Sequence, residues 1–186
     1  VNRFKQVYFF VNDILIFNQR HMGIRVLFIY PNTYGMNMLP PAIALFSALL
    51  KQRGHLVDLF DATYYQTDHG VDSDGTKATR LNVVPFSPNE NGIKMRITDW
   101  RDDIKEKVKS FQPDLIALST TEDMWLLGAR MLEEIEEFII RHRIPVIAGG
   151  VFPTFAPELV IRHRLVDMVC VGEGEDTLID LCEDRK

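Results

Sequence analysis

The stretch Val169-Cys170-Val171-Gly172-Glu173-Gly174-Glu175-Asp176-Thr177 decides the fold, because a short apolar strand runs directly into a turn of glycines and acids. An apolar, helix-like segment follows at Leu178. In folds built from strand–helix units, the turns that follow the strands form the ligand-binding edge of the sheet. This stretch therefore predicts the last unit of a parallel sheet and one wall of a ligand site.

Similar units precede this stretch. Continuous apolar runs, typical of strands buried on both faces, occupy residues 25–30, 56–61, 115–119 and 145–148, and a fifth runs from 168 to 171. Helical patterns occupy residues 41–53, 99–111, 125–141 and 157–163, with a last one from 178. Strands that alternate with helices predict a parallel sheet covered on both faces. Because crossovers are right-handed, we expect an α/β, flavodoxin-like (Rossmann-like), doubly wound five-stranded parallel sheet in strand order 2-1-3-4-5.

Composition excludes several classes of protein. The chain has 186 residues, of which 46% are hydrophobic and 25% charged, as in an ordinary globular domain. Its net charge of -5 provides no support for nucleic-acid binding, and no apolar run is long enough to span a bilayer. Cys170 and Cys182 fall in a predicted strand and a predicted helix rather than in a disulfide framework, so we expect a cytoplasmic protein.

Some segments do not fit the alternating pattern. Residues 1–21 contain interrupted apolar runs without the cleavage site of a signal peptide, and Met22 directly precedes the first strand region. We therefore expect an N-terminal extension or docking segment at 1–21, followed by one domain at 22–186. Residues 65–98 are polar and rich in Gly, Asp and Asn, which is typical of an inserted loop. The final helix stops within a few turns, so we expect a piece of a longer chain.

The turns at the carboxyl ends of the predicted strands supply the candidate binding residues. They are Asn32, Thr33, Tyr34, Gly35, Ser119, Thr120, Thr121, Gly149, Gly150, Val151, Phe152, Pro153, Gly172, Glu173 and Gly174. Small side chains dominate, no lysine or arginine is present, and the first turn has neither G-x-G-x-x-G nor a P-loop motif. A nucleotide phosphate site would favour such a motif. The turns therefore indicate a large, mostly neutral ligand that approaches the backbone closely.

Several segments follow one another in a characteristic order. They are Val26–Asn32, Pro40-Pro41, Arg53-Gly54-His55, Leu118–Thr121, Ala148–Thr154 with Pro157-Glu158, and Val171–Glu175. Together they resemble the N-terminal cobalamin (vitamin B12)-binding domain of cobalamin-dependent radical S-adenosylmethionine proteins. The resemblance covers roughly residues 22–181, with residues 65–97 its least typical part. Each motif is weak alone, and their order and spacing make the resemblance specific.

The resemblance implies a role for each turn. The Ser119 turn and the Gly149-Gly150 turn would line the nucleotide tail of cobalamin, where a missing Cβ lets a ligand approach the backbone. The turn Gly172–Glu175 would close the far wall with its backbone N–H groups, and Asn32–Asn37 would lie under the corrin ring. The resemblance also implies that the full-length protein is an enzyme, of the methyltransferase class, whose partners are cobalamin and a radical S-adenosylmethionine domain downstream.

Two departures from the family refine these expectations. The turn Asn32–Asn37 lacks the histidine of the D-x-H-x-x-G motif that ligates cobalt in the wider cobalamin-binding fold. We therefore expect cobalamin to bind with its lower base displaced and without a histidine or other metal ligand from this chain. Two cysteines cannot form the C-x-x-x-C-x-x-C motif of the radical domain. S-adenosylmethionine and a 4Fe–4S cluster are therefore expected only in the downstream domain, and no catalytic residue or activity is expected in this fragment.

Structural interpretations compete with the functional ones. Gly149-Gly150 also suits an ordinary turn of a doubly wound fold, and Glu173 and Glu175 favour the N-terminus of a following helix. Asp123 is a candidate helix N-cap, and His55 is a candidate surface residue. The alternative function is therefore a flavodoxin-like, non-catalytic domain that binds another ligand or a protein partner.

Overall fold

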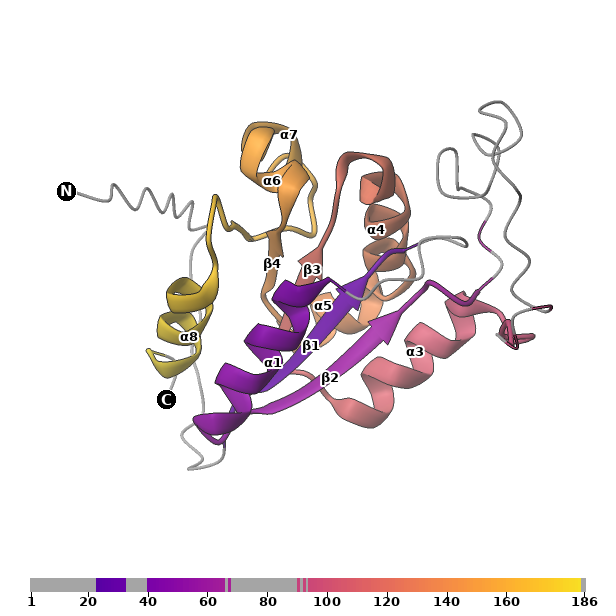
Figure 1. Cartoon of the computed structure of the whole chain (residues 1–186), viewed down its shortest axis with the longest axis horizontal. Coiled ribbons are helices and arrows are strands. Elements are labelled where there is room, and N and C mark those ends of the chain that lie inside the picture. The colour runs from indigo at the N-terminus through magenta and orange to yellow at the C-terminus, as the bar shows by residue number, and fades with distance from the viewer. Residues whose placement is uncertain are drawn as a thin grey trace.

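The computed structural model describes residues 23–32, 40–65, 67, 90, 92 and 94–184, which form a parallel sheet with helices on both faces (Figure 1). The five strands are β1 (Arg25–Tyr30), β2 (Leu56–Asp61), β3 (Leu115–Ser119), β4 (Val146–Gly149) and β5 (Met168–Val169). Their order is β2-β1-β3-β4-β5, which confirms the predicted topology. Because every pair is parallel, the turns at the carboxyl ends lie along one edge.

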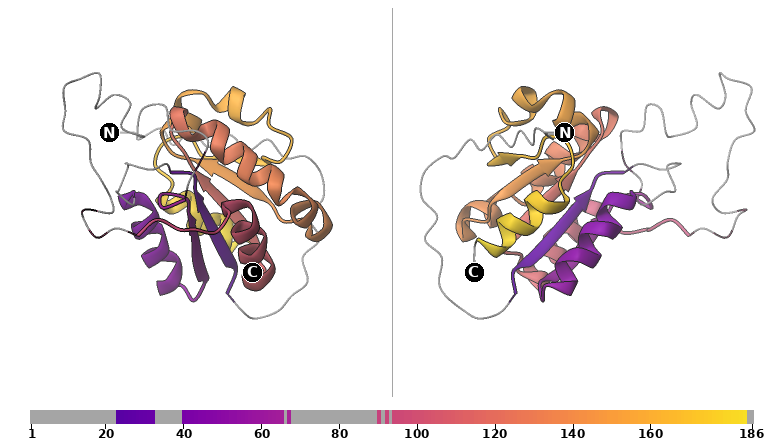
Figure 2. Two further views of the ribbon diagram at one scale, coloured as in Figure 1. Left: turned by 90° about the vertical axis from the view of Figure 1, so that its right-hand side faces the viewer. Right: turned by 60° about the vertical axis from the view of Figure 1, so that its left-hand side comes forward.

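Helices cover the two faces of the sheet in separate groups. They are α1 (Pro41–Gln52), α3 (Trp100–Phe111), α4 (Glu122–Glu134), α5 (Glu136–His142), α6 (Val151–Phe155), α7 (Pro157–Val160) and α8 (Glu175–Glu183). Figure 2 shows α1 and α8 over one face, and α3, α4 and α5 over the other. The short helices α6 and α7 stand at the carboxyl edge beside β4 (Figure 1).

The side chains of β1 alternate between these two faces. Val26 and Phe28 pack in the apolar cluster under α1 and α8, whereas Leu27 and Ile29 pack in the cluster under α3 and α4. All four side chains are buried, with 2% or less of their surface exposed. Burial on both faces explains why the sequence of this strand is continuously apolar rather than alternating.

The ends of α1 follow from its local sequence. Pro41 occupies the first turn, where its fixed φ suits the helix and its missing N–H is not needed. After the helix, Gly54 adopts a φ of +82°, and its N–H donates to the carbonyl of Lys51 at 3.0 Å. The predicted start and the predicted glycine cap are therefore confirmed.

The structure corrects the single helix predicted at 125–141. Two helices are present, α4 and α5, and Ile135 between them has a φ of -110° and a ψ of 13°. The Ile135 N–H donates to the Leu132 carbonyl at 3.2 Å, so the last turn of α4 is tightened. Ile135 itself is buried, which continues the apolar spacing across the break. The N-cap residue is Thr121, and the predicted cap Asp123 lies inside the first turn.

The structure also corrects the predicted surface position of His55. Its side chain is 2% exposed, and its Nδ1 accepts a 3.1 Å hydrogen bond from the backbone N–H of Ile24. The chain at Gly23 passes so close that a Cβ there would lie 1.8 Å from the carbonyl oxygen of Gly54. His55 therefore satisfies a buried backbone donor at the amino end of the sheet, far along the strands from the ligand edge.

The two ends of the predicted insertion meet beside β2. The Arg96 N–H donates to the Tyr64 carbonyl at 2.8 Å, and the Arg96 guanidinium lies 5.1 Å from the centre of the Tyr65 ring. The Tyr65 hydroxyl donates to the Asp103 carboxylate at 2.7 Å, which joins this segment to α3. Most of the predicted loop at 65–98 lies outside the described residues.

The predicted extension at 1–21 also lies outside the described residues. Among the helices that are described, none combines the length and the apolar character needed to cross a bilayer.

Candidate functional site

A pocket of about 160 Å³ lies between α1, α8 and the carboxyl halves of β3, β4 and β5, and we refer to it as the edge pocket. It is lined by Phe28, Ala42, Phe46, Ala117, Leu118, Ser119, Ile147, Gly149, Gly150, Cys170, Gly172, Glu173, Gly174, Glu175 and Leu178. The structure thus brings together three of the predicted turns, those that follow β3, β4 and β5. An apolar cavity of comparable volume can hold a benzene ring.

The deep walls of the edge pocket are apolar. Ala117 on β3, Ile147 on β4 and Leu178 on α8 are all buried. Phe28 on β1 and Phe46 on α1 stack with ring centroids 6.3 Å apart and an interplanar angle of 19°. These walls suit a flat, apolar group better than a charged one, because a charge would be desolvated there without a partner.

Gly149 and Gly174 bring backbone close to this cavity. A Cβ on Gly149 would lie 3.6 Å from Cβ of Cys170, an ordinary contact, so the protein itself does not require glycine at this position. A Cβ on Gly174 would lie 3.2 Å from Sγ of Cys170 and 3.3 Å from the Phe46 ring. Gly149 therefore leaves space that a ligand can use, while Gly174 allows the turn after β5 to pack against α1.

Gly150 has a different role from its neighbour. Its φ is +106°, and a Cβ would lie 2.7 Å from the carbonyl oxygen of Thr120. Glycine is thus needed at this position to pack the turn after β4 against the turn after β3. We expected its missing side chain to leave room for a ligand, but the direction of the Cβ shows that the room is taken by protein backbone.

Thr154 joins the two outer turns of the site. Its Oγ1 donates to the carbonyl of Gly150 at 2.7 Å and accepts from the N–H of Gly172 at 3.1 Å. Gly172 has a φ of +84°, which glycine adopts without strain. Sequence reasoning included Thr154 in the family motif but not among the binding residues. The only local signal was a hydroxyl residue placed after two glycines and a proline.

The turn after β3 contains two neighbouring hydroxyl residues with different surroundings. Thr120 is buried, and its hydroxyl donates to the carbonyl of Thr121 at 2.8 Å. Ser119 is half-buried and lines the edge pocket, and within the described residues its hydroxyl has no hydrogen bond to protein. Ser119 can therefore offer a donor or an acceptor to a ligand, whereas Thr120 holds its own turn together. Thr121 is exposed and makes no side-chain cap bond to α4.

Asn32 points toward β2 rather than into the edge pocket. Its side chain is 1% exposed, and its Nδ2 donates to Oγ1 of Thr63 at 2.8 Å. Thr63 in turn donates to the carboxylate of Asp61 at 2.5 Å. Asn32 thus links the first turn to the second. The other predicted residues of that turn, Thr33, Tyr34 and Gly35, lie outside the described residues.

The residues predicted as a turn at 151–153 form a helix instead. Val151, Phe152 and Pro153 belong to α6, whose first residue follows Gly150 directly. Val151 is 59% exposed, Pro153 is buried, and the Phe152 ring lies 5.8 Å from the Trp125 ring. None of the three lines the edge pocket.

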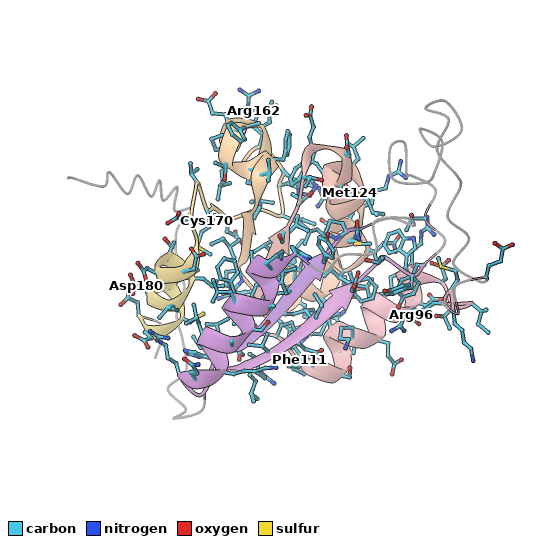
Figure 3. The ribbon with its side chains drawn as sticks, in the orientation of Figure 1. Arg96, Phe111, Met124, Arg162, Cys170 and Asp180 are labelled. Carbon is cyan, nitrogen blue, oxygen red and sulfur yellow. The ribbon has the colours of Figure 1, made fainter. Side chains whose placement is uncertain are left out.

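Cys170 is a titratable residue in the lining of the edge pocket. Figure 3 labels it just before α8, on the segment that follows β5 along the chain. Burial raises the pKa of its thiol, and the carboxylate of Glu175 raises this pKa further. Glu175 is the first residue of α8, where the helix N-terminus favours an acid, and Glu173 is exposed at the rim. Cys170 therefore presents a neutral, weakly polar surface to the pocket.

Solved structures with the same fold belong to cobalamin-dependent enzymes. The radical S-adenosylmethionine methyltransferase TsrM from Kitasatospora setae, solved with cobalamin and a 4Fe–4S cluster, has a TM-score of 0.61 and 18% identity over 88% of this chain. The cobalamin-dependent S-adenosylmethionine radical enzyme OxsB, solved with aqua-cobalamin, has a TM-score of 0.58 and 20% identity over 88% of this chain. The match covers 26% of the TsrM chain and 19% of the OxsB chain.

Sequence comparisons agree with this fold. An uncharacterized methyltransferase of Pyrococcus horikoshii is 34% identical over 85 residues, which are 44% of this chain and 17% of that protein. This chain therefore corresponds to a small part of the proteins it matches. The family model of the B12 binding domain matches residues 89–181, half of the sequence, and this range contains the turns after β3, β4 and β5 that line the edge pocket. The chain therefore belongs to the B12-binding domain family.

Proposed function

We propose that this chain is the cobalamin-binding module of a radical S-adenosylmethionine enzyme of the methyltransferase class. The observation that carries the proposal is the edge pocket, an apolar cavity built from three turns of a B12-binding domain. Its volume of about 160 Å³ suits one aromatic group and is too small for a corrin ring. The pocket thus receives the nucleotide tail of cobalamin, and the corrin ring lies outside on the carboxyl edge.

Particular residues hold the tail in this proposal. Gly149 leaves its Cβ position open to the ligand, and Ser119 offers its hydroxyl to the lower base. Phe28 and Phe46 cover the flat face of the base. The turn Gly172–Gly174 closes the opposite wall, and these residues exclude water from the buried part of the tail. Bound cobalamin supplies the cobalt that serves in methyl transfer.

Cobalamin is held with its lower base displaced and without a histidine ligand in this proposal. A base that occupies the edge pocket cannot at the same time coordinate cobalt from below. Among the described histidines, His55 is buried at the amino end of the sheet, and His163 packs against the Trp125 ring at 5.9 Å. His142 is exposed on α5, on the face opposite the pocket. No histidine lines the edge pocket within the described residues.

The catalytic half of the enzyme is proposed to lie in a downstream domain that binds S-adenosylmethionine and a 4Fe–4S cluster. Within the described residues, no group of three or more His, Cys, Asp or Glu side chains could hold a metal ion. We propose that this chain alone binds cobalamin in the cytoplasm and that the reaction itself takes place on the downstream domain. The domain is proposed to span 22–186.

Titration with hydroxocobalamin tests this function. We expect the 186-residue chain to acquire a stable visible absorption in a one-to-one complex that survives gel filtration. After reduction to cobalt(II), electron paramagnetic resonance should show no superhyperfine splitting from an axial nitrogen. Splitting from an imidazole would contradict the absence of a histidine ligand, and a colourless protein after gel filtration would contradict the function itself.

A further inference from the structure

We propose that the edge pocket selects corrinoids by their lower base and favours a benzimidazole over a purine. This inference rests on the proposed function, because it requires the nucleotide tail to enter the pocket. It goes further by naming the chemical class of corrinoid that this chain accepts.

The first support is the polarity of the deep walls. Phe28, Ile147 and Leu178 are each at least nine-tenths buried, and they present only hydrocarbon to the cavity. Ala117 on β3 adds a methyl group to the same wall. A methylated benzimidazole ring is itself almost wholly hydrocarbon, so its burial here removes apolar surface from water on both sides of the contact.

The second support is the state of the backbone carbonyls around the pocket. The carbonyl of Gly149 accepts from the Thr120 N–H at 3.0 Å. The carbonyl of Gly150 accepts from the N–H and the hydroxyl of Thr154, and that of Gly174 accepts from the N–H of Leu178 at 2.9 Å. Each of these three carbonyls therefore already accepts from a protein donor, and the Gly150 carbonyl, which accepts twice, has both lone pairs engaged.

The third support is the small supply of polar side chains. Ser119 offers one hydroxyl without a protein partner in the described part of the chain, and the Cys170 thiol is a weak donor. The lining also has two carboxylates, which only accept hydrogen bonds: Glu173 is exposed at the rim, and Glu175 is half-buried at the start of α8 near Cys170. One hydroxyl matches a benzimidazole, which has a single ring nitrogen to satisfy once it leaves cobalt. Adenine has further ring nitrogens, which are acceptors that neither carboxylate can satisfy and which would lose water without gaining a donor.

The size of the effect follows from the cost of unpaired polar groups. One buried, unsatisfied group lowers affinity by about tenfold or more. A purine ring nitrogen is also less basic than that of benzimidazole and coordinates cobalt more weakly. Detaching the lower base from cobalt before binding therefore costs less free energy for the purine corrinoid. This difference by itself favours binding of the purine corrinoid, so it cannot be the cause of a preference for benzimidazole.

The experiment compares three cobalt corrinoids on the whole chain by visible titration: cobalamin, the analogue with an adenine lower base, and cobinamide, which has no nucleotide tail. We expect cobalamin to bind at least about tenfold more tightly than the adenine analogue. Equal affinity of these two corrinoids, or a preference for the adenine analogue, would overturn the inference and leave the proposed function standing.

Two variants make the test specific to the pocket. Ala117→Ser adds a hydroxyl to the deep wall and should narrow the preference for benzimidazole, because the purine gains a partner. Ala129→Ser adds the same group to α4, where Ala129 is 9% exposed and outside the pocket, and should leave the preference unchanged. For the parent and for each variant, the affinity for cobalamin is divided by the affinity for the adenine analogue. The cost of detaching each base from cobalt in the free corrinoid is the same for every protein, so it cancels when these ratios are compared.

The remaining outcomes separate this inference from the function on which it rests. If cobinamide binds as tightly as cobalamin, the tail does not enter the pocket and the inference fails, although the chain still binds a corrinoid. A further outcome is that the parent prefers cobalamin while Ala117→Ser leaves the ratio of the affinities for cobalamin and the adenine analogue unchanged. In that case the deep wall does not discriminate between the two bases, and the inference is overturned. If none of the three corrinoids binds, the proposed function fails and the inference fails with it.

Discussion

The hydroxyl of Thr154 in α6 accepts a 3.1 Å hydrogen bond from the backbone N–H of Gly172, and this bond joins α6 to the turn after β5, from which it is separated along the chain by α7 and β5. The same oxygen donates to the carbonyl of Gly150 at 2.7 Å. One hydroxyl thus links the turn after β4 to the turn after β5 at the edge pocket. Its geometry sets how far apart these two walls of the proposed tail site stand.

Replacement of Thr154 should weaken binding of the tail more than it weakens the fold. Thr154→Val keeps the shape of the side chain but removes both hydrogen bonds, each of which contributes about 1 kcal/mol. We expect the affinity for cobalamin to fall about three- to tenfold and the affinity for cobinamide to stay constant. Visible titration of both corrinoids measures this difference.

Thr154→Ser is the matched control, since it keeps the hydroxyl and should bind cobalamin like the parent. Because Gly150 and Gly172 are exposed, water can replace the lost partners, and the melting temperature of Thr154→Val should change little. An equal loss of affinity for both corrinoids would show that Thr154 does not act through the tail.

Alanine at the two adjacent glycines should separate folding from binding. Gly150→Ala places a Cβ 2.7 Å from the Thr120 carbonyl at a φ of +106°, so we expect a loss of about 2 kcal/mol or more of unfolding free energy. Gly149→Ala meets only Cys170, at 3.6 Å, and should fold normally while it binds cobalamin more weakly. Denaturant unfolding without cofactor and visible titration measure the two effects.

Gly149 and Gly150 serve as controls for each other, because both line the same pocket. If Gly149→Ala binds cobalamin as tightly as the parent, the tail does not occupy the space beside this residue. If Gly150→Ala unfolds at the same denaturant concentration as the parent, the close approach to Thr120 does not limit stability.

Cys170 should react slowly with alkylating reagents and should be protected by the cofactor. Burial and the Glu175 carboxylate raise the pKa of this thiol, so less of it is thiolate at pH 8 than in a free cysteine. Its alkylation rate should rise with pH over a higher range than that of a free thiol, and cobalamin should slow it further. Mass spectrometry of iodoacetamide-treated protein measures the labelling at each pH.

Cys182 provides an internal reference for this measurement, because its side chain is fully buried and should stay unlabelled in the folded protein. Cys170→Ser should remove the cobalamin-dependent labelling. Rapid labelling of Cys170 at neutral pH, or equal labelling with and without cobalamin, would contradict its position in the pocket wall.

His55 should contribute to stability and not to cobalt ligation. His55→Ala removes the acceptor of the buried Ile24 N–H and leaves a cavity, so we expect a loss of about 2–4 kcal/mol. His142→Ala, at an exposed position on α5, should change stability by about 0.5 kcal/mol or less. Denaturant unfolding measures both, and the cobalt(II) resonance spectrum of each cobalamin complex should match that of the parent.

Local sequence determined most of the sheet. The continuous apolar run 25–30 requires burial on both faces, and this requirement predicts a parallel central strand without knowledge of its neighbours. Pro41 and Gly54 mark the ends of α1 because their backbone preferences act within a few residues. The glycine and hydroxyl turns after the strands also predicted the edge at which the edge pocket lies.

The break at Ile135 could not be predicted in the same way. Both helices bury the same face, so the apolar spacing passes through the break unchanged. The predicted surface position of His55 was wrong for a related reason. Its burial depends on the N–H of Ile24, a residue distant along the chain that reaches it only through the pairing of β1 with β2.

The sequence by itself therefore determined the family, the strand order and the turns that line the edge pocket, because these follow from local patterns and from their order along the chain. Only the tertiary structure decided the depth and polarity of the edge pocket, which combines Phe28, Phe46 and Leu178 from three separate elements. It also decided that Gly150 serves the packing of Thr120 while Gly149 leaves room for a ligand. The physical reason is that a Cβ direction or a wall contact depends on backbone brought close by folding, which neighbouring residues in the sequence do not specify.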